Sequence, residues 1–572
     1  MKKTKIISLA LAAVLSLTTF TACASATPKA TYGGSKVSPQ VTTNFTHVTG
    51  SNWKSQPSAA NSRKDTLVVG NSDMTGVWSK EFGTNAYDWY VCDTMFDYMV
   101  NPTADGKAQT NTATYKVSSN GLVYTFSLKK GIKYWDGNEA TANDLEFWYY
   151  VLSDPKFDGA FDLSTANIKG FDAYKKGSAK TIPGIKVVNK YTLQITLTKP
   201  SAPAIWSLNI PLMEKSYYGP KFKKGDAKAV EKKLSAPMGT GAYKFSNFSA
   251  AKGAKLTANN AYFNGKPKIK NLQFVTIAQG KELQALQTGI VDVSNPTLNS
   301  DNMTQMKKAK FIDGYYFPVN AYGFVQFNIQ DAKYKDVRVR QALTYALDRA
   351  SIVKAVYGPY AVVNNLPLPT ATWAYSKSGL STYAYNLAKA RSLLTEAGWA
   401  INPSTNQLEK DGKAFVVNFT MSKGNSVTEA MLPVMKQAYA KLGITVNIQY
   451  ADWGTLYNDY CAGKLDALFL ATNLSTPDPD QSTGYMTGGT QNYYKYSNKA
   501  LDKLIKQELV ETNQAKRTQE FFAINKIYNS DLPVMPIYQR NDFWTINGRV
   551  KFAGSFGTFR DIDYDIYKWS IK

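Results

Sequence analysis

The chain has few of the residues on which histidine-dependent and metal-dependent chemistry relies. Its 572 residues include one histidine and three cysteines. One histidine argues against a histidine-ligated metal site and a histidine-based catalytic triad, and three cysteines cannot complete a four-thiolate zinc site or a disulfide framework. Hydrophobic residues at 44% and charged residues at 19% are typical of a globular protein. The composition therefore favours a large binding protein or an enzyme that uses carboxylates.

Long apolar runs are scarce, and the one that stands out lies at the N-terminus. Three lysines within the first five residues precede an uncharged stretch at 6–20. That stretch has the length of a signal-peptide core and is shorter than the roughly 20 residues of a membrane-spanning helix. Its end, Phe20-Thr-Ala-Cys23, resembles a bacterial lipobox. We therefore predict a signal peptide at 1–22 and a lipidated Cys23 that anchors the protein to the outer face of the cytoplasmic membrane of a Gram-positive bacterium.

Acidic residues are absent from the segment 23–64, which is rich in Ser, Thr, Ala, Asn and Gly. Such a composition buries too little apolar surface to order itself. We therefore predict a flexible tether that joins Cys23 to the folded part. The only histidine, His47, falls inside this tether and is expected to have no ligand role.

Positive charge dominates the chain, with 67 Lys and Arg against 43 Asp and Glu and a net charge of +24. Removing the eight basic residues of the first 64 positions leaves +16 for the remainder. No dense Lys/Arg stripe with interleaved aromatic residues is present, so we expect no nucleic-acid partner. On an exported protein, the charge suits anionic lipids and cell-wall polymers.

Hydrophobic periodicity predicts an α/β architecture. Apolar residues alternate with other residues over 121–129, which predicts a strand, and Thr141 stands three residues before Asp144 as in a capping box at a helix start. Farther along, 415–421, 426–442 and 444–450 have the pattern of a strand, a helix and a second strand. Such a βαβ unit predicts at least one mostly parallel sheet.

Several sequence blocks resemble the extracellular solute-binding proteins of family 5, the receptors of oligopeptide and dipeptide ABC importers. They occur in the order of that family and include 124–137, 237–245, 336–349, 389–399, Asp452-Trp453 and Asp478-Pro-Asp480. The resemblance implies a periplasmic-binding-protein-like type II clamshell with two lobes and an additional small domain. By analogy, lobe I combines 65–96, 236–318 and 541–572, the additional domain is 97–235, and lobe II is 319–540. The chain is expected to cross between the lobes near 318 and 540, and these two crossings to form the hinge. Closure of the lobes is expected to bury the ligand.

The resemblance also implies which residues contact the ligand. An extended peptide can pair with strand edges in the cleft as an added β-strand, and such bonds ignore side-chain identity. The implied backbone partners are Thr84, Asn85 and Ala86 in lobe I and Ala471, Thr472, Asn473 and Ser475 in lobe II. Trp453 is a further candidate, although an aromatic residue among apolar neighbours more often belongs to a core.

The sequence departs from the family at Ser475. Family members that grip a free peptide N-terminus usually have an aspartate there, three residues before the Asp-Pro dipeptide. A buried ammonium group needs a carboxylate partner, so strict dipeptide binding is not favoured. Asp478 or Asp480 is a substitute anchor in one interpretation. In the other interpretation, both belong to a proline-bounded turn with solvated acids.

Other charged residues and the thiols are given structural roles. Arg338, Arg340, Asp348 and Arg349 are expected to be solvated or to form salt bridges between the lobes. Cys92 and Cys461 are expected to be isolated buried thiols.

Three function classes remain open. The first is a monomeric oligopeptide-binding lipoprotein that delivers its cargo to ABC transporter permease subunits, with no catalytic residue, metal or cofactor. The second is the same scaffold with a signalling peptide or a non-peptide solute such as an oligosaccharide; a nickel complex is disfavoured because the folded part offers no histidine. The third is a secreted hydrolase with paired carboxylates.

Overall fold

The computed structural model describes residues 45–159, 161–474 and 476–572. The signal peptide predicted at 1–22, the lipidation site predicted at Cys23 and the candidate Ser475 lie outside the described residues. Over the described part of the chain, every helix is too short or too polar to cross a bilayer.

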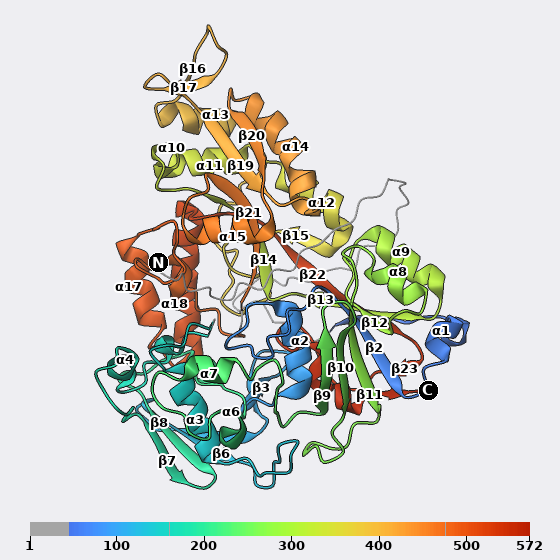
Figure 1. Ribbon diagram of the computed structural model, residues 1–572. Helices are drawn as coiled ribbons and strands as arrows, with labels where there is room; N and C mark the ends of the chain where they lie inside the picture. Colours follow the sequence, from blue (N-terminus) through green and yellow to red (C-terminus); the bar gives the residue numbers. More distant parts are fainter. Residues whose placement is uncertain (1–44, 160, 475) are drawn as a thin grey trace.

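A mixed sheet runs through the molecule and joins its two halves (Figure 1). Its main path follows the order β20-β19-β21-β14-β22-β12-β2-β11-β10-β9. The bounds are β20 (Thr445–Tyr450), β19 (Val416–Met421), β21 (Ala467–Asn473), β14 (Ala321–Phe327), β22 (Met535–Asn547), β12 (Val293–Ser294), β2 (Thr66–Asn71), β11 (Asn271–Thr276), β10 (Gly253–Ala258) and β9 (Tyr243–Ser249). Beside this path lie β1 (Thr46–Val48), β13 (Ile312–Pro318) and β15 (Ala361–Val363).

The long strand β22 changes partners midway. Its first half pairs with β14 and with β15, up to the pair Ala361↔Arg540. From Asn541 onward it pairs with β13 and then β12. We propose lobe boundaries near 318 and 540, and this change of partners supports them.

Lobe I packs apolar side chains on both faces of its sheet. In β2, Leu67 and Val69 enter one core while Val68 enters another, as the alternation of a strand requires. The helices here are α1 (Ser58–Asn61), α2 (Ala86–Met95), α8 (Glu282–Gln287) and α9 (Ser300–Ala309). Near the C-terminus lie β23 (Val550–Lys551), the 3-10 segment η4 (Ile562–Lys568) and β24 (Ser570–Ile571).

The additional domain is built on the antiparallel sheet β5-β6-β8-β7. Tyr124, Phe126 and Leu128 of β6 are buried, which confirms the predicted strand, and both bonds of the predicted capping box are present at the start of α3. The domain shares one apolar core with lobe I. Its elements are β3 (Val100–Pro102), β4 (Ala108–Thr110), β5 (Ala113–Val117), β6 (Val123–Leu128), α3 (Ala142–Leu152), α4 (Phe171–Lys175), β7 (Ile185–Asn189), β8 (Thr192–Thr196), α5 (Ala204–Ser207), α6 (Lys215–Tyr218) and α7 (Ala227–Glu231).

Lobe II contains the predicted βαβ unit, because β19 and β20 are parallel neighbours connected through α14 (Ser426–Ala440). One apolar core lies on each face of its sheet. The remaining helices are α10 (Ala332–Lys335), α11 (Val337–Tyr345), α12 (Arg349–Tyr357), α13 (Leu387–Glu396), α15 (Trp453–Cys461), α16 (Ser482–Tyr485), α17 (Lys499–Glu508) and α18 (Gln514–Asp531). A small sheet joins β16 (Ala400–Ile401), β17 (Leu408–Lys410) and β18 (Lys413–Ala414).

The tether expected over 23–64 is wrong for residues 45–64, which fold against lobe I. The strand β1 pairs with β13. The ring of His47 stacks on that of Tyr315, with 4.3 Å between the ring centroids. Arg63 Nη2 lies 2.8 Å from Asp292 Oδ1. A polar segment needs no core of its own when an existing sheet edge satisfies its backbone groups, which composition cannot show.

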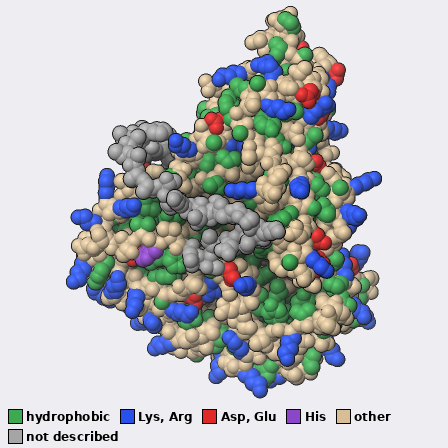
Figure 2. Space-filling view, turned by 180° about the vertical axis from the view of Figure 1, so that it is seen from behind, with side chains coloured by type: hydrophobic (Ala, Val, Ile, Leu, Met, Phe, Trp, Pro, Cys, Tyr) green, Lys and Arg blue, Asp and Glu red, His purple; other side chains and the backbone are tan. Residues whose placement is uncertain are grey.

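Basic side chains are spread over the visible face in Figure 2 and do not gather in one stripe there. This face therefore has no continuous basic stripe of the kind that follows a nucleic-acid backbone.

Two of the arginines expected to be solvated or to bridge the lobes are instead buried within lobe II. Arg349, 3% exposed, donates to the carbonyl oxygens of Asn364, Pro536, Thr382 and Tyr383 at 2.7–3.1 Å. Arg340 likewise donates to the carbonyls of Tyr334, Lys335, Asp531 and Leu532. Burial lowers the pKa of Arg349 to about 10. Each guanidinium group thus donates hydrogen bonds to backbone carbonyls of chain segments that are distant in sequence.

Of the other two charged residues of that group, Arg338 is exposed and Asp348 is half-buried. Arg338 Nη2 lies 2.6 Å from Asp336 Oδ2. Asp348 caps α12, because its Oδ1 accepts a hydrogen bond from the Ser351 amide at 3.0 Å. Of the two thiols, Cys92 is buried as predicted, whereas Cys461 is only half-buried.

We expect Arg349→Met to lower the free energy of unfolding by at least about 3 kcal/mol, since each buried carbonyl left without a donor costs on the order of 1–3 kcal/mol. The matched control, Arg338→Met, removes an exposed arginine and should change it by no more than about 0.5 kcal/mol. Urea unfolding monitored by tryptophan fluorescence measures both variants. Equal stability of the two would contradict the buried role of Arg349.

Candidate ligand-binding site

A cavity of about 170 Å³ lies in lobe II beside β14 and the end of β21. Its wall is rich in tyrosine, with Tyr322, Tyr460, Tyr485, Tyr493, Tyr494 and Tyr496 among the lining residues. The hydroxyls of Tyr322 and Tyr485 lie 3.1 Å apart. Tyrosine offers an apolar ring and a polar hydroxyl, so this wall can contact both side chains and polar groups of a ligand.

Four of the predicted ligand residues line this cavity. They are Thr472, Asn473, Asp478 and Asp480, and Ala471 directly precedes them in β21. Thr84, Asn85, Ala86 and Trp453 are not among its lining residues. The cavity therefore brings together the described candidates of β21 and of the Asp-Pro-Asp block, but not Trp453 or the candidates of lobe I.

The end of β21 has an open edge. The strand β19 pairs with β21 only at Ala467 and Leu468. On the other edge, the amide of Leu474 donates to Asn320 in the antiparallel ladder with β14. Because the bonding direction alternates along an antiparallel strand, the backbone groups of Ala471 and Asn473 point away from β14.

Among the described strands, none pairs with Ala471 or Asn473 on that open side. The carbonyl of Asn473 has a contact of 3.5 Å with the Thr472 hydroxyl, which is long for a hydrogen bond. The edge can therefore accept one more strand, as expected of a site that binds an extended chain.

Asp478 is engaged in a buried ion-pair network, and neither of its predicted roles fits this arrangement. Its oxygens Oδ2 and Oδ1 accept from Arg517 at 2.5 and 2.8 Å. The same guanidinium lies 2.8 Å from Glu508 Oε2. Burial opposes the charge of Arg517, but the neighbouring Asp478 and Glu508 outweigh it and raise the pKa of this arginine. The carboxylate of Asp478 is therefore neither solvated nor free to hold an ammonium group.

Asp480 is the second acid of the Asp-Pro-Asp block. Its carboxylate accepts from the Ser482 amide at 2.7 Å and from the Ser482 hydroxyl at 3.1 Å. Burial, together with repulsion from Asp478, raises the pKa of Asp480. A carboxyl group in this state gains from a cationic or hydrogen-bond-donating neighbour, so Asp480 is the better candidate for ligand contact.

The lobe I candidates sit at the start of α2. Asn85 is the N-cap: its Oδ1 accepts from the Tyr87 amide at 2.8 Å, and its Nδ2 donates to the Asp73 carbonyl at 2.8 Å. These bonds fix the loop before the helix. Ligand contact by Thr84, Asn85 and Ala86 stays a prediction.

Trp453 is the first residue of α15 and is 39% exposed, so it does not belong to a core. Its ring lies 5.5 Å from that of Tyr457. Ligand contact by Trp453 stays a prediction.

Several lining residues were missed by the sequence reasoning. Tyr322 belongs to β14, and Gln481 and Tyr485 follow the Asp-Pro-Asp block. The one available signal was the concentration of tyrosine, with 37 in the chain and three within 493–496. Periodicity cannot distinguish a cavity wall from a core, because both bury aromatic rings.

Comparisons with known proteins identify the family. The model described as bacterial extracellular solute-binding proteins, family 5, middle region, matches residues 107–494, more than half of the chain. The chain therefore belongs to this family of solute-binding proteins.

The oligopeptide-binding protein AppA of Bacillus subtilis is 26% identical over 514 residues, which covers 88% of this chain and 91% of AppA. Heme-binding protein A of Haemophilus influenzae is 25% identical over 459 residues, which covers 77% and 80% of the two chains. A structure of AppA from Bacillus subtilis in complex with a nonapeptide has a TM-score of 0.75 and 25% identity, and covers 89% of this chain and 99% of that one. The fold is the type II periplasmic-binding-protein-like α/β clamshell.

We expect Arg517→Met to destabilise the protein by about 3–5 kcal/mol, because it leaves buried carboxylates without their cation. The loss should be larger at pH 8 than at pH 5. Burial raises the pKa of Glu508, and Arg517 partly opposes that rise. Without the arginine, the folded-state pKa of Glu508 rises further, so the variant loses more stability as rising pH removes the proton. Chemical unfolding at both pH values measures this, with the exposed neighbour Lys516→Met as control. A loss independent of pH would contradict the ion-pair network.

Proposed function

We propose that this protein is the extracytoplasmic receptor of an ABC importer for oligopeptides, which it captures between two closing lobes and delivers to the permease without chemical turnover. The open edge of β21 at Ala471 and Asn473, beside the tyrosine-rich cavity, carries the proposal. The similarity to AppA, whose structure holds a nonapeptide, supports it.

The binding mode follows from this edge. Each alternate residue of β21 can exchange two hydrogen bonds with a peptide backbone, whatever the peptide sequence. A polar and aromatic wall then accommodates varied side chains, with water filling the remaining space. Broad sequence tolerance combined with an extended backbone is the expected result.

Peptides longer than dipeptides fit the site better. Ser475 replaces the acid that grips a free N-terminus, and Asp478 is engaged by Arg517. An ammonium group inside the cleft would then lack a dedicated partner, which is costly. A longer peptide whose charged ends stay hydrated avoids that cost.

The other function classes have weaker support. Heme-binding protein A indicates that relatives carry other cargo, but the only histidine of this chain stacks on Tyr315 in lobe I and does not line the cavity. A carboxylate hydrolase needs a free acid pair, whereas Asp478 is neutralised by Arg517. We further propose that Cys23 is lipidated and holds the receptor, as a monomer, on the outer face of the cell membrane.

Native mass spectrometry of protein purified without denaturation from a peptide-rich medium tests the cargo. We expect a ladder of bound masses that match peptides longer than two residues and that disappear on denaturation. One discrete non-peptide mass would retain the fold and refute the peptide proposal. Loss of added peptide under catalytic amounts of protein would refute the receptor role.

Strand addition is tested by Asn473→Pro, which removes the amide hydrogen on the open edge without removing a bond to β14. We expect peptide affinity to fall about tenfold, the equivalent of about 1.4 kcal/mol, which is within the range of one hydrogen bond. Asn473→Ala keeps the amide and is the control. Titration calorimetry with one peptide recovered from the native complex measures both. Equal affinity of the two variants would refute pairing at this residue.

A further inference from the structure

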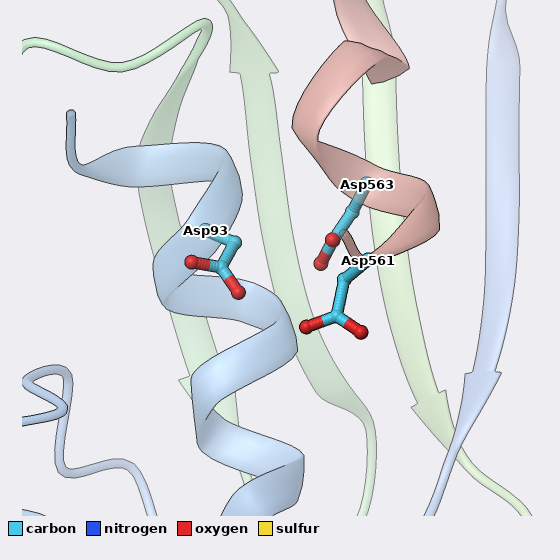
Figure 3. Close-up of side chains that lie close together, drawn as sticks. All are labelled: Asp93, Asp561 and Asp563. Atoms are coloured by element: carbon cyan, nitrogen blue, oxygen red, sulfur yellow. The ribbon is translucent and has the colours of Figure 1, made fainter. Parts of the chain in front are cut away.

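Three aspartates from two distant parts of the chain converge in lobe I. Asp93 lies on α2, whereas Asp561 and Asp563 lie at the start of η4 (Figure 3). One oxygen from each carboxylate can be chosen so that all three lie within 4.8 Å of one another. Figure 3 shows the carboxylates of Asp561 and Asp563 together on the η4 side of the space, with that of Asp93 across from them on α2.

The cluster contains a buried carboxylate without a partner. Asp563 is 5% exposed, and neither of its oxygens has a hydrogen-bond partner among the described residues. Leaving such a group unpaired is costly, so its presence calls for an explanation such as an ion. This observation is independent of the proximity of the three acids.

The surroundings do not neutralise the cluster. Lys80 Nζ lies 2.5 Å from Asp93 Oδ1 and is the cation paired with these acids. Arg560 directly precedes Asp561 in the sequence. It forms an ion pair with Asp565 and donates a hydrogen bond to the Pro102 carbonyl. Three carboxylates and one ammonium group leave a formal charge of −2, which one divalent cation would balance.

The crowding of the three carboxylates agrees with a net negative charge at the cluster. One oxygen of each carboxylate lies within 4.8 Å of the corresponding oxygens of the other two. Crowded acids that face each other produce a field that favours a cation.

We propose that Asp93, Asp561 and Asp563 form a binding site for a hard divalent cation, Ca²⁺. The ligand set consists of oxygens alone, which hard cations prefer, whereas Zn²⁺ sites use nitrogen and sulfur. Three carboxylates on two elements do not define an octahedron, so the flexible coordination of Ca²⁺ suits them better than the strict geometry of Mg²⁺. Asp561 is exposed, which gives the ion a route from solvent and leaves room for water ligands.

The consequence of the site is mechanical. The ion would join α2 to η4 near the C-terminus, and the loop Thr84–Ala86 lies at the other end of α2. A bound ion would therefore hold in place the helix that carries the predicted lobe I ligand loop. The ion would not itself contact cargo in the lobe II cavity, because none of its three ligands lines that cavity.

Calcium titration of the full chain, purified and treated with EDTA, tests the site. By calorimetry we expect one Ca²⁺ per chain with a dissociation constant on the order of 10⁻⁴–10⁻³ M, as in extracellular modules. Thermal unfolding should shift upward with 10 mM CaCl₂ and not with NaCl of equal ionic strength. Absence of binding heat and of the shift, or an equal shift with NaCl, would overturn the proposal.

Variants locate the ion. Asp561→Asn changes the exposed ligand and should fold normally, and Asp563→Asn changes the buried one; each should weaken Ca²⁺ binding at least tenfold. Asp172→Asn removes an exposed acid from α4 in the additional domain and should leave the affinity unchanged. Equal Ca²⁺ affinity in the wild type and Asp561→Asn would overturn the site.

A peptide-binding measurement distinguishes a site for a metal ion from a site for a cationic group of the cargo. If Asp561→Asn weakens the binding of a lysine-containing peptide while Ca²⁺ binding is unchanged, the cluster holds the cargo and the proposal is wrong. If Ca²⁺ binding is lost while peptide binding persists, the proposal is supported whatever the cargo is.

Discussion

Both lobes are hydrogen-bonded to the same strand, β22, and the architecture depends on that shared backbone. Up to Arg540 the strand pairs with β14 and β15, and from Asn541 it pairs with β13 and β12. A continuous strand keeps the lobes in register while torsions near the change of partners can alter the angle between them. In the lobe closure that we propose, few residues would then need to change conformation.

Buried arginines hold separate chain segments together within each lobe. In lobe I, Arg549 joins Asp292 at 2.8 Å and bonds the carbonyl of Thr66, which ties the C-terminal segment to β2. In lobe II, Arg349 and Arg517 collect carbonyls and carboxylates from separate segments. Buried charges of this kind are strongly destabilising when broken, so they favour one arrangement of each lobe.

The open edge of β21 and the aspartate cluster are two of the features that are left unsatisfied within this frame. Ala471 and Asn473 direct backbone groups toward no described strand, and Asp563 directs a carboxylate toward no described donor. Polar groups that are left unpaired at a cost are where a ligand gains most. In the functions that we propose, a peptide backbone would satisfy the first and a divalent cation would satisfy the second.

The sequence alone determined the family and the local elements. The ordered blocks, the alternation in 121–129 and the capping box at Thr141 depend on neighbouring residues, and the structure confirms them. Tertiary structure decided what depends on distant partners. Arg349 is buried because four carbonyls from elsewhere in lobe II meet it, Asp478 is paired because α18 brings Arg517 beside it, and 45–64 are ordered because β13 offers an edge. Composition and periodicity carry no information on such encounters, since the partners lie tens to hundreds of residues away.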